Sequence, residues 1–133
     1  MKVDGQCHCG QIRYEAQADA DKVSICHCTD CQSLTGSAYR VSVPVAAADF
    51  KLLSGAPKIY IKTAESGNQR AQAFCGNCGS PIYAADPVNP KSFSIRVGTL
   101  TQRDTLPPMR QIWCRSALPW TADIRGLDRS ERA

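Results

Sequence analysis

The eight cysteines of this 133-residue chain constrain its fold most strongly, because seven of them fall into three short groups. The groups are Cys7-His8-Cys9, Cys26-His27-Cys28-Thr29-Asp30-Cys31 and Cys75-Gly76-Asn77-Cys78. Two thiolates from one tight turn reach the same metal ion with little ordering cost, and a second pair from far along the chain can complete a tetrahedron. The spacing therefore predicts a fold built around metal–thiolate centres.

Metal ligation is favoured over disulfide bonding. Met1 to Gly10 contains no apolar signal-peptide core, and no stretch approaches the ~20 apolar residues that span a bilayer. We therefore expect a cytoplasmic protein that does not contact a membrane. Thiols stay reduced in the cytoplasm, where cysteine groups of this kind bind metal more often than they form disulfides.

The first and last groups predict a closed four-cysteine site. Cys75-x-x-Cys78 followed by Gly79 has the form of a zinc knuckle, and Cys7-x-Cys9 is a shorter clip of the same kind. Four thiolates leave zinc no open position, so such a site is structural. A redox role for the Cys75/Cys78 pair is the alternative, but no βαβ pattern of the thioredoxin type surrounds it.

The middle group predicts an open site. Cys26, Cys28 and Cys31 supply three thiolates, so zinc would keep a fourth position for water or substrate, as in catalytic sites. A substrate thiol, whose free pKa is about 8.5, would be bound there as thiolate. The alternatives are a redox-active cluster, part of an iron–sulfur site, or a closed site completed by a histidine. His8 and His27 lie inside the clips, and we expect them to be neighbours rather than ligands.

Outside the cysteines, short alternating runs predict strands. The expected strands are Gln11–Glu15, Arg40–Val43, Lys58–Thr63, Gln69–Phe74, Ser80–Tyr83, Ser92–Val97 and Gln111–Arg115. Glycine, proline and asparagine between these runs supply turns. Many short strands with regular turns predict an all-β domain of sandwich or barrel type.

Few segments favour helix. Cys28 to Thr35 predicts one short helical turn that ends at Gly36. Val45 to Leu53 is ambiguous, since its three successive alanines favour helix but the run is short. Cys114 follows strand-like Ile112-Trp113 and is most simply a buried core cysteine.

Composition is that of a globular domain, with 43% hydrophobic and 21% charged residues. We expect residues 1–126 to form one domain and the polar residues 127–133 to form a flexible tail. The net charge of +4 is mild, and aromatic residues are only 7%, without a dense basic stripe between them. A nucleic-acid partner is therefore not expected. The sequence carries no signal for an oligomeric state.

Three motifs and two shorter segments are shared with one known family. They are Gly5-Gln6-Cys7-His8-Cys9-Gly10, Cys26-His27-Cys28-Thr29-Asp30-Cys31, Phe74-Cys75-Gly76-Asn77-Cys78-Gly79-Ser80, Gln111-Ile112-Trp113 and Pro119-Trp120. In these, from about Val3 to Trp120, the chain resembles the glutathione-dependent formaldehyde-activating family, which also includes centromere protein V. All seven ligand positions of that family are present.

The resemblance implies a β-tent fold of small antiparallel sheets with zinc-ribbon-like cysteine knuckles. It implies two zinc ions, and the structural one is held by Cys7, Cys9, Cys75 and Cys78. The second, catalytic zinc is held by Cys26, Cys28 and Cys31. The implied activity joins glutathione, a small-molecule thiol, to formaldehyde and gives S-hydroxymethylglutathione. Formally this is a carbon–sulfur lyase running in reverse.

Substrate contacts are predicted less directly. Glutathione is anionic, so Arg40, Arg70 and Arg96 are candidates to line its path, because each lies in or beside a predicted strand. The alternative is that they are solvated surface arginines. Asp30 lies between two predicted ligands, so its carboxylate would either shuttle the thiol proton or cap the short helix.

Two other classes of function remain open at this point. A non-catalytic zinc module for a protein or nucleic-acid partner would have a closed second site, completed by a histidine or by Cys114. A thiol redox sensor would use the three-cysteine group and would lose one zinc on reversible oxidation.

Overall fold

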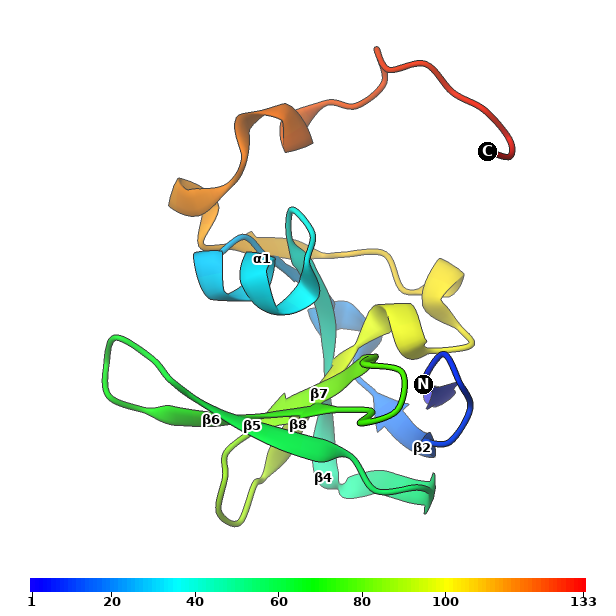
Figure 1. Ribbon diagram of the computed structural model, residues 1–133, viewed down its shortest axis with the longest axis vertical. Helices are drawn as coiled ribbons and strands as arrows, with labels where there is room; N and C mark the ends of the chain where they lie inside the picture. The colour runs from blue at the N-terminus through cyan, green and yellow to red at the C-terminus, as the bar shows by residue number, and fades with distance from the viewer.

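Nine strands and one α-helix make up the regular structure of the computed structural model, which describes residues 1–133 (Figure 1). The strands are β1 (Lys2–Gln6), β2 (Arg13–Ala18), β3 (Ser24–Cys26), β4 (Arg40–Ser54), β5 (Lys58–Thr63), β6 (Gln69–Phe74), β7 (Pro81–Ala85), β8 (Ser92–Arg96) and β9 (Arg110–Ile112). The helix is α1 (Thr29–Thr35). Short 3-10 helices span Ala20–Lys22, Val97–Thr99, Arg103–Thr105, Cys114–Ser116 and Pro119–Ala122. None of its helices is both long and apolar enough to cross a membrane.

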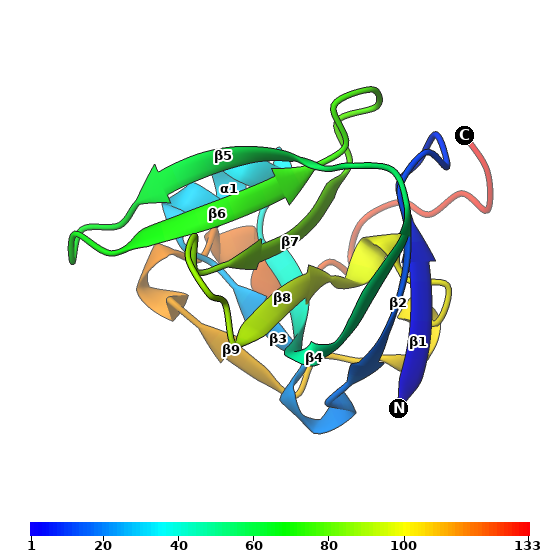
Figure 2. The same cartoon turned by 90° about the horizontal axis from the view of Figure 1, so that it is seen from below.

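Strand β4 joins the two halves of the sheet. The strand order is β1-β2-β4-β8-β7-β6-β5, and every neighbouring pair in it is antiparallel. Residues Ser42–Ala46 of β4 pair with β8, whereas its later part, from Phe50 to Ser54, pairs with β2 (Figure 2). Beside this path, β3 pairs with the start of β4 and runs parallel to β9. The predicted all-β fold of antiparallel strands is confirmed.

The apolar core includes part of one cysteine group. Tyr14 is fully buried, its ring stacks on Phe50, and its hydroxyl lies 2.7 Å from the hydroxyl of Thr99. Gly5 packs directly against Tyr14, where any Cβ would overlap the phenol ring. Cys7 and Cys75 belong to the same core, together with Val3, Ile12, Val43, Ile82, Ile95 and Leu100. The sulfur-bearing turns are therefore continuous with the packing that holds the sheet together.

Several predicted strands agree with the structure, and Lys58–Thr63 and Gln69–Phe74 match β5 and β6 to the residue. The ambiguous segment Val45–Leu53 is strand, because its backbone pairs with β8 and then with β2. The prediction for Gln111–Arg115 was too long. The strand β9 stops at Ile112, since Trp113 takes a left-handed backbone conformation and a 3-10 helix follows.

The sequence pattern missed β1 and β3. Strand β1 alternates buried and exposed residues but is interrupted by Gly5, and β3 has only three residues. The last seven residues, Leu127–Ala133, contain no helix or strand and are all exposed. Their flexibility stays a prediction.

Candidate metal centres and their surroundings

The first and third cysteine groups meet in space. The sulfur atoms of Cys7, Cys9, Cys75 and Cys78 all lie within 4.8 Å of one another. The Sγ atom of Cys9 is 3.6 Å from that of Cys7 and 3.7 Å from that of Cys75. Zinc–thiolate bonds of ~2.3 Å in a tetrahedron place neighbouring sulfurs ~3.8 Å apart. The donor set and its spacing therefore fit a four-coordinate zinc ion.

Two tight turns aim these sulfurs at one point. In the N-terminal turn, the N–H of Gly10 donates to the carbonyl of Cys7 at 3.1 Å, and the N–H of Ile12 donates to the sulfur of Cys7 at 3.2 Å. In the knuckle, the N–H of Gly79 donates to the carbonyl of Cys75 at 2.8 Å. Gly10 and Gly79 both have φ of +80°, a conformation that side chains disfavour. This explains why a glycine follows each clip.

Ser80 links the two turns, although sequence reasoning gave it no role. Its hydroxyl accepts the backbone N–H of His8 at 3.0 Å and lies 3.3 Å from the sulfur of Cys78. Hydrogen bonds from the hydroxyl and backbone of Ser80 lower the pKa of Cys78 to about 5. A thiolate is the form that binds metal, so the turn favours it before an ion arrives.

The three-cysteine group comes from a single segment. The sulfurs of Cys26, Cys28 and Cys31 lie within 4.8 Å of one another, and no histidine, carboxylate or fourth cysteine joins them. Cys26 ends β3, and Cys28 is the N-cap of α1, where its sulfur accepts the N–H of Cys31 at 3.2 Å. Gly36 ends the helix in a left-handed conformation, as predicted. Three sulfurs from one turn match a zinc ion that keeps a fourth position.

Burial is uniform in this second group and uneven in the first. Cys26, Cys28 and Cys31 are all half-buried, whereas Cys7 and Cys75 are each 1% exposed and Cys9 is exposed. Burial raises the pKa of Cys31 to about 12, and the neighbouring Cys28 and Cys26 add to the shift. Metal binding must therefore displace a proton from this sulfur.

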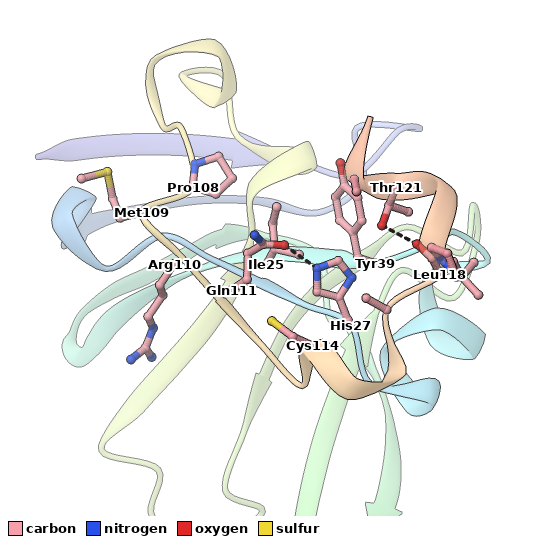
Figure 3. Close-up of a pocket in the computed structure, with 13 residues that line it drawn as sticks. Ile25, His27, Tyr39, Pro108, Met109, Arg110, Gln111, Cys114, Leu118 and Thr121 are labelled. Atoms are coloured by element: carbon pink, nitrogen blue, oxygen red, sulfur yellow. Dashed lines mark hydrogen bonds between the residues drawn. The ribbon is translucent and has the colours of Figure 1, made fainter. Parts of the chain in front are cut away.

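The histidines lie outside both groups. His27 is 2% exposed, and its Nε2 lies 2.7 Å from Oε1 of Gln111 (Figure 3). His8 bonds to Ser80 through its backbone N–H, not through its imidazole. Neither imidazole belongs to a cysteine group, in agreement with their predicted role as neighbours.

Cys114 is exposed, so the prediction of a buried core cysteine was wrong. The chain leaves β9 at Trp113 and places Cys114 in a 3-10 helix at the surface. There it lines a cavity of about 890 Å³ together with His27 and Tyr39 (Figure 3). None of the seven grouped cysteines lines that cavity.

A second cavity, of about 640 Å³, opens at the three-cysteine group. Cys28, Asp30 and Lys62 line it, and the carboxylate of Asp30 pairs with Nζ of Lys62 at 2.9 Å. Of the two roles considered for Asp30, the helix cap is not the one observed, because Cys28 caps α1. Trp113 also lines this cavity. Its φ of +56° is a left-handed conformation that bulky residues rarely adopt, and it costs about 1–3 kcal/mol of backbone strain. The guanidinium of Arg115 lies 5.1 Å from the centre of its ring.

The three candidate arginines separate into two kinds. Arg70 pairs with Asp86 at 2.8 Å near the surface, as a solvated arginine would. Arg40 and Arg96 are instead buried, at 5% and 8% exposure. Arg40 lies directly opposite Cys26 in the pairing of β3 with β4, so it borders the three-cysteine group.

Together, the fold and the site define a small β domain organised around one four-cysteine and one three-cysteine cluster. Residues 2–116 match the family of glutathione-dependent formaldehyde-activating enzymes, and the chain belongs to that family. Among solved structures, it is similar to the crystal structure of a protein from Rhodobacter sphaeroides, with a TM-score of 0.62 and 19% identity. The alignment covers 81% of this chain and 98% of that one, and it supports the fold.

Proposed function

We propose that this protein is a zinc-dependent enzyme of the carbon–sulfur lyase type that acts on a thiol adduct such as S-hydroxymethylglutathione. The observation that carries the proposal is a three-sulfur group with no fourth protein ligand, beside a cavity of about 640 Å³ that reaches Cys28. Membership of the glutathione-dependent formaldehyde-activating family supports the choice of thiol and aldehyde. The enzyme would work in the cytoplasm, where substrate thiols stay reduced.

The two cysteine groups would have separate tasks. Cys7, Cys9, Cys75 and Cys78 would hold a structural zinc, because four thiolates satisfy its coordination. Cys26, Cys28 and Cys31 would hold the second zinc and, as only three ligands, would leave it one coordination position for substrate near the cavity that Cys28 lines. When bound there, zinc would supply the positive charge that keeps a substrate thiol ionised at neutral pH.

The reaction needs no oxidant. In the forming direction, the sulfur of the substrate makes a bond to the carbonyl carbon of formaldehyde, and the carbonyl oxygen takes up a proton. The proton comes from the thiol, so atoms and charge balance. Asp30 lies at the cavity, and its carboxylate is 55% exposed while it pairs with Lys62. This carboxylate can therefore accept the thiol proton and return it to the oxygen.

Exchange NMR tests the proposal directly. Zinc-loaded protein is mixed with glutathione and formaldehyde, and the exchange between free and hydroxymethylated thiol is followed. The wild type should accelerate exchange, Cys28→Ser should not, and Cys114→Ser should behave as the wild type because Cys114 lies in neither group. A wild-type rate equal to the uncatalysed background at full zinc loading would remove the proposed activity.

A further inference from the structure

Two buried arginines converge on one neutral oxygen. Nη1 of Arg40 donates to Oε1 of Gln72 at 3.1 Å, and Nη2 of Arg96 donates to the same oxygen at 2.9 Å. Nη1 of Arg96 also donates to the hydroxyl of Ser42 at 2.9 Å. No carboxylate pairs with either guanidinium. The ion pairs of the molecule are formed instead by Lys22, Lys62, Arg70 and Arg125. Two like charges are thus buried together without an anion, which is costly.

Both side chains also have unused donors. The Nε atoms of Arg40 and Arg96 are buried and have no hydrogen-bond partner. Burial lowers the pKa of both groups, to about 9 for Arg96, where the charge of Arg40 adds to the effect. A guanidinium nevertheless stays charged in proteins at neutral pH. The partner that this pair lacks is therefore an anion.

The two guanidinium groups line a cavity of about 520 Å³. Its other lining includes Gln72, Tyr60 and Leu34, so an anion there would meet few polar groups besides the arginines and Gln72. The volume lies within the usual range for small-molecule sites.

This cavity adjoins the three-cysteine group. Leu34 belongs to α1, the helix that also carries Cys31, and α1 lies over β5 and β6 in both views (Figures 1 and 2). The first residues of α1 line the 640 Å³ cavity at Cys28, whereas Leu34 lines the cavity of the arginines. Both cavities therefore border α1, the helix that carries Cys31.

The metal centre alone would not balance both charges. Three thiolates around a divalent zinc carry about one net negative charge. That charge can offset the guanidinium of Arg40, which lies opposite Cys26. Arg96 lies on β8, one strand further away, and although Cys31 and Cys26 also act on it, one negative charge cannot neutralise two guanidinium groups.

We propose that Arg40 and Arg96, oriented by Gln72, bind a carboxylate of the substrate thiol. Guanidinium groups form paired hydrogen bonds with carboxylates, which adds geometric selectivity to charge. The anion is here part of the same molecule as the reacting sulfur. In this one respect the assignment rests on the proposed function. It assigns to Arg40 and Arg96 the selection of thiols that carry a carboxylate.

Binding of S-methylglutathione to zinc-loaded protein tests this site without the reaction, because the methylated sulfur cannot form an adduct. Calorimetry would compare this acid with its dimethyl ester, which lacks both carboxylates. The acid should bind the wild type about tenfold or more tightly than the ester, since hydrogen bonds between charged groups are worth that much. Equal affinities, or no binding of the acid at millimolar concentration, would overturn the proposal.

Variants locate the effect. Arg96→Gln should abolish the preference for the acid, and Arg96→Lys should retain part of it. Arg70→Gln removes the same charge from a residue that lines neither cavity and should keep the preference. A full preference in folded Arg96→Gln would overturn the assignment.

Sulfate provides a test that does not depend on how the variants fold. At constant ionic strength, sulfate in place of chloride should weaken binding of the acid to the wild type and leave the ester unaffected. If sulfate weakens neither or both equally, no anion site competes for the carboxylate, and the proposal fails.

The two proposals fail separately. Arginine-dependent binding of the acid without any accelerated exchange in the NMR assay would remove the reaction and keep the carboxylate site. Accelerated exchange without discrimination between acid and ester would keep the reaction and remove the site.

Discussion

The two cysteine groups have the same kind of donor but very different positions in the chain. One joins Cys7 and Cys9 to Cys75 and Cys78, across more than half of the sequence, and two of its members are in the core. The other lies within the six residues from Cys26 to Cys31, and none of its members is fully buried. An ion in the first group closes a long loop and so contributes to the fold, whereas an ion in the second constrains only one turn.

The largest expected effect separates the two groups by folding. Cys75→Ser should leave the chain largely unfolded, because structural zinc sites contribute about 10–16 kcal/mol, comparable to the whole stability of a domain. Circular dichroism and metal analysis of the purified variant check this. Cys114→Ser, the matched control, should fold normally. A folded Cys75→Ser protein with a normal melting temperature would show that the four-cysteine group is not structural.

Removal of metal should proceed in two steps. A three-ligand site that exchanges its fourth position holds zinc less tightly than a closed four-ligand site. Titration with a chelator should therefore release the first zinc without a change in circular dichroism and the second together with unfolding. Release of both ions in one step, coincident with unfolding, would contradict the division.

Substitution in the second group should affect chemistry rather than folding. Cys28→Ser should reduce thiol–aldehyde exchange to background and lower the zinc content, because it removes one of three ligands. Its circular dichroism spectrum should match that of the wild type. Unfolding as extensive as that of Cys75→Ser would mean that both groups are structural.

Ser80→Ala should have the smallest effect and should be confined to the first group. The hydroxyl accepts the N–H of His8 and lies beside the sulfur of Cys78, so its loss should cost about 0.5–1.5 kcal/mol. The free energy of unfolding in urea measures the change. The rate of thiol–aldehyde exchange should be unaltered at full zinc loading, and a large fall in that rate would show that the two centres are coupled.

The sequence-based predictions succeeded where the signal is local. Closely spaced cysteines reach a common point through one turn, and α1 ends at Gly36 because a glycine readily takes the left-handed conformation found there. Strands β5 and β6 alternate and are bounded by turn residues, which explains the agreement there.

The failures arise from contacts between distant segments. Val45–Leu53 becomes strand through pairing with β2, which its alanines do not reveal. The burial of Arg40 and Arg96 depends on β4, β8 and β6 meeting around Gln72. Cys114 is exposed because the backbone turns at Trp113. That residue has a left-handed backbone conformation, which the sequence does not indicate because neither glycine nor asparagine occupies the position.

The difference between the two centres is tested most directly by metal-edge diffraction from crystals soaked with glutathione. The protein used for the crystals should contain two zinc ions per chain, as measured by metal analysis. We expect one ion among Cys7, Cys9, Cys75 and Cys78 with no other ligand. We expect a second ion among Cys26, Cys28 and Cys31 whose fourth ligand is the sulfur of glutathione. A fourth ligand supplied by the protein at the second ion, such as His27 or Cys114, would contradict this expectation.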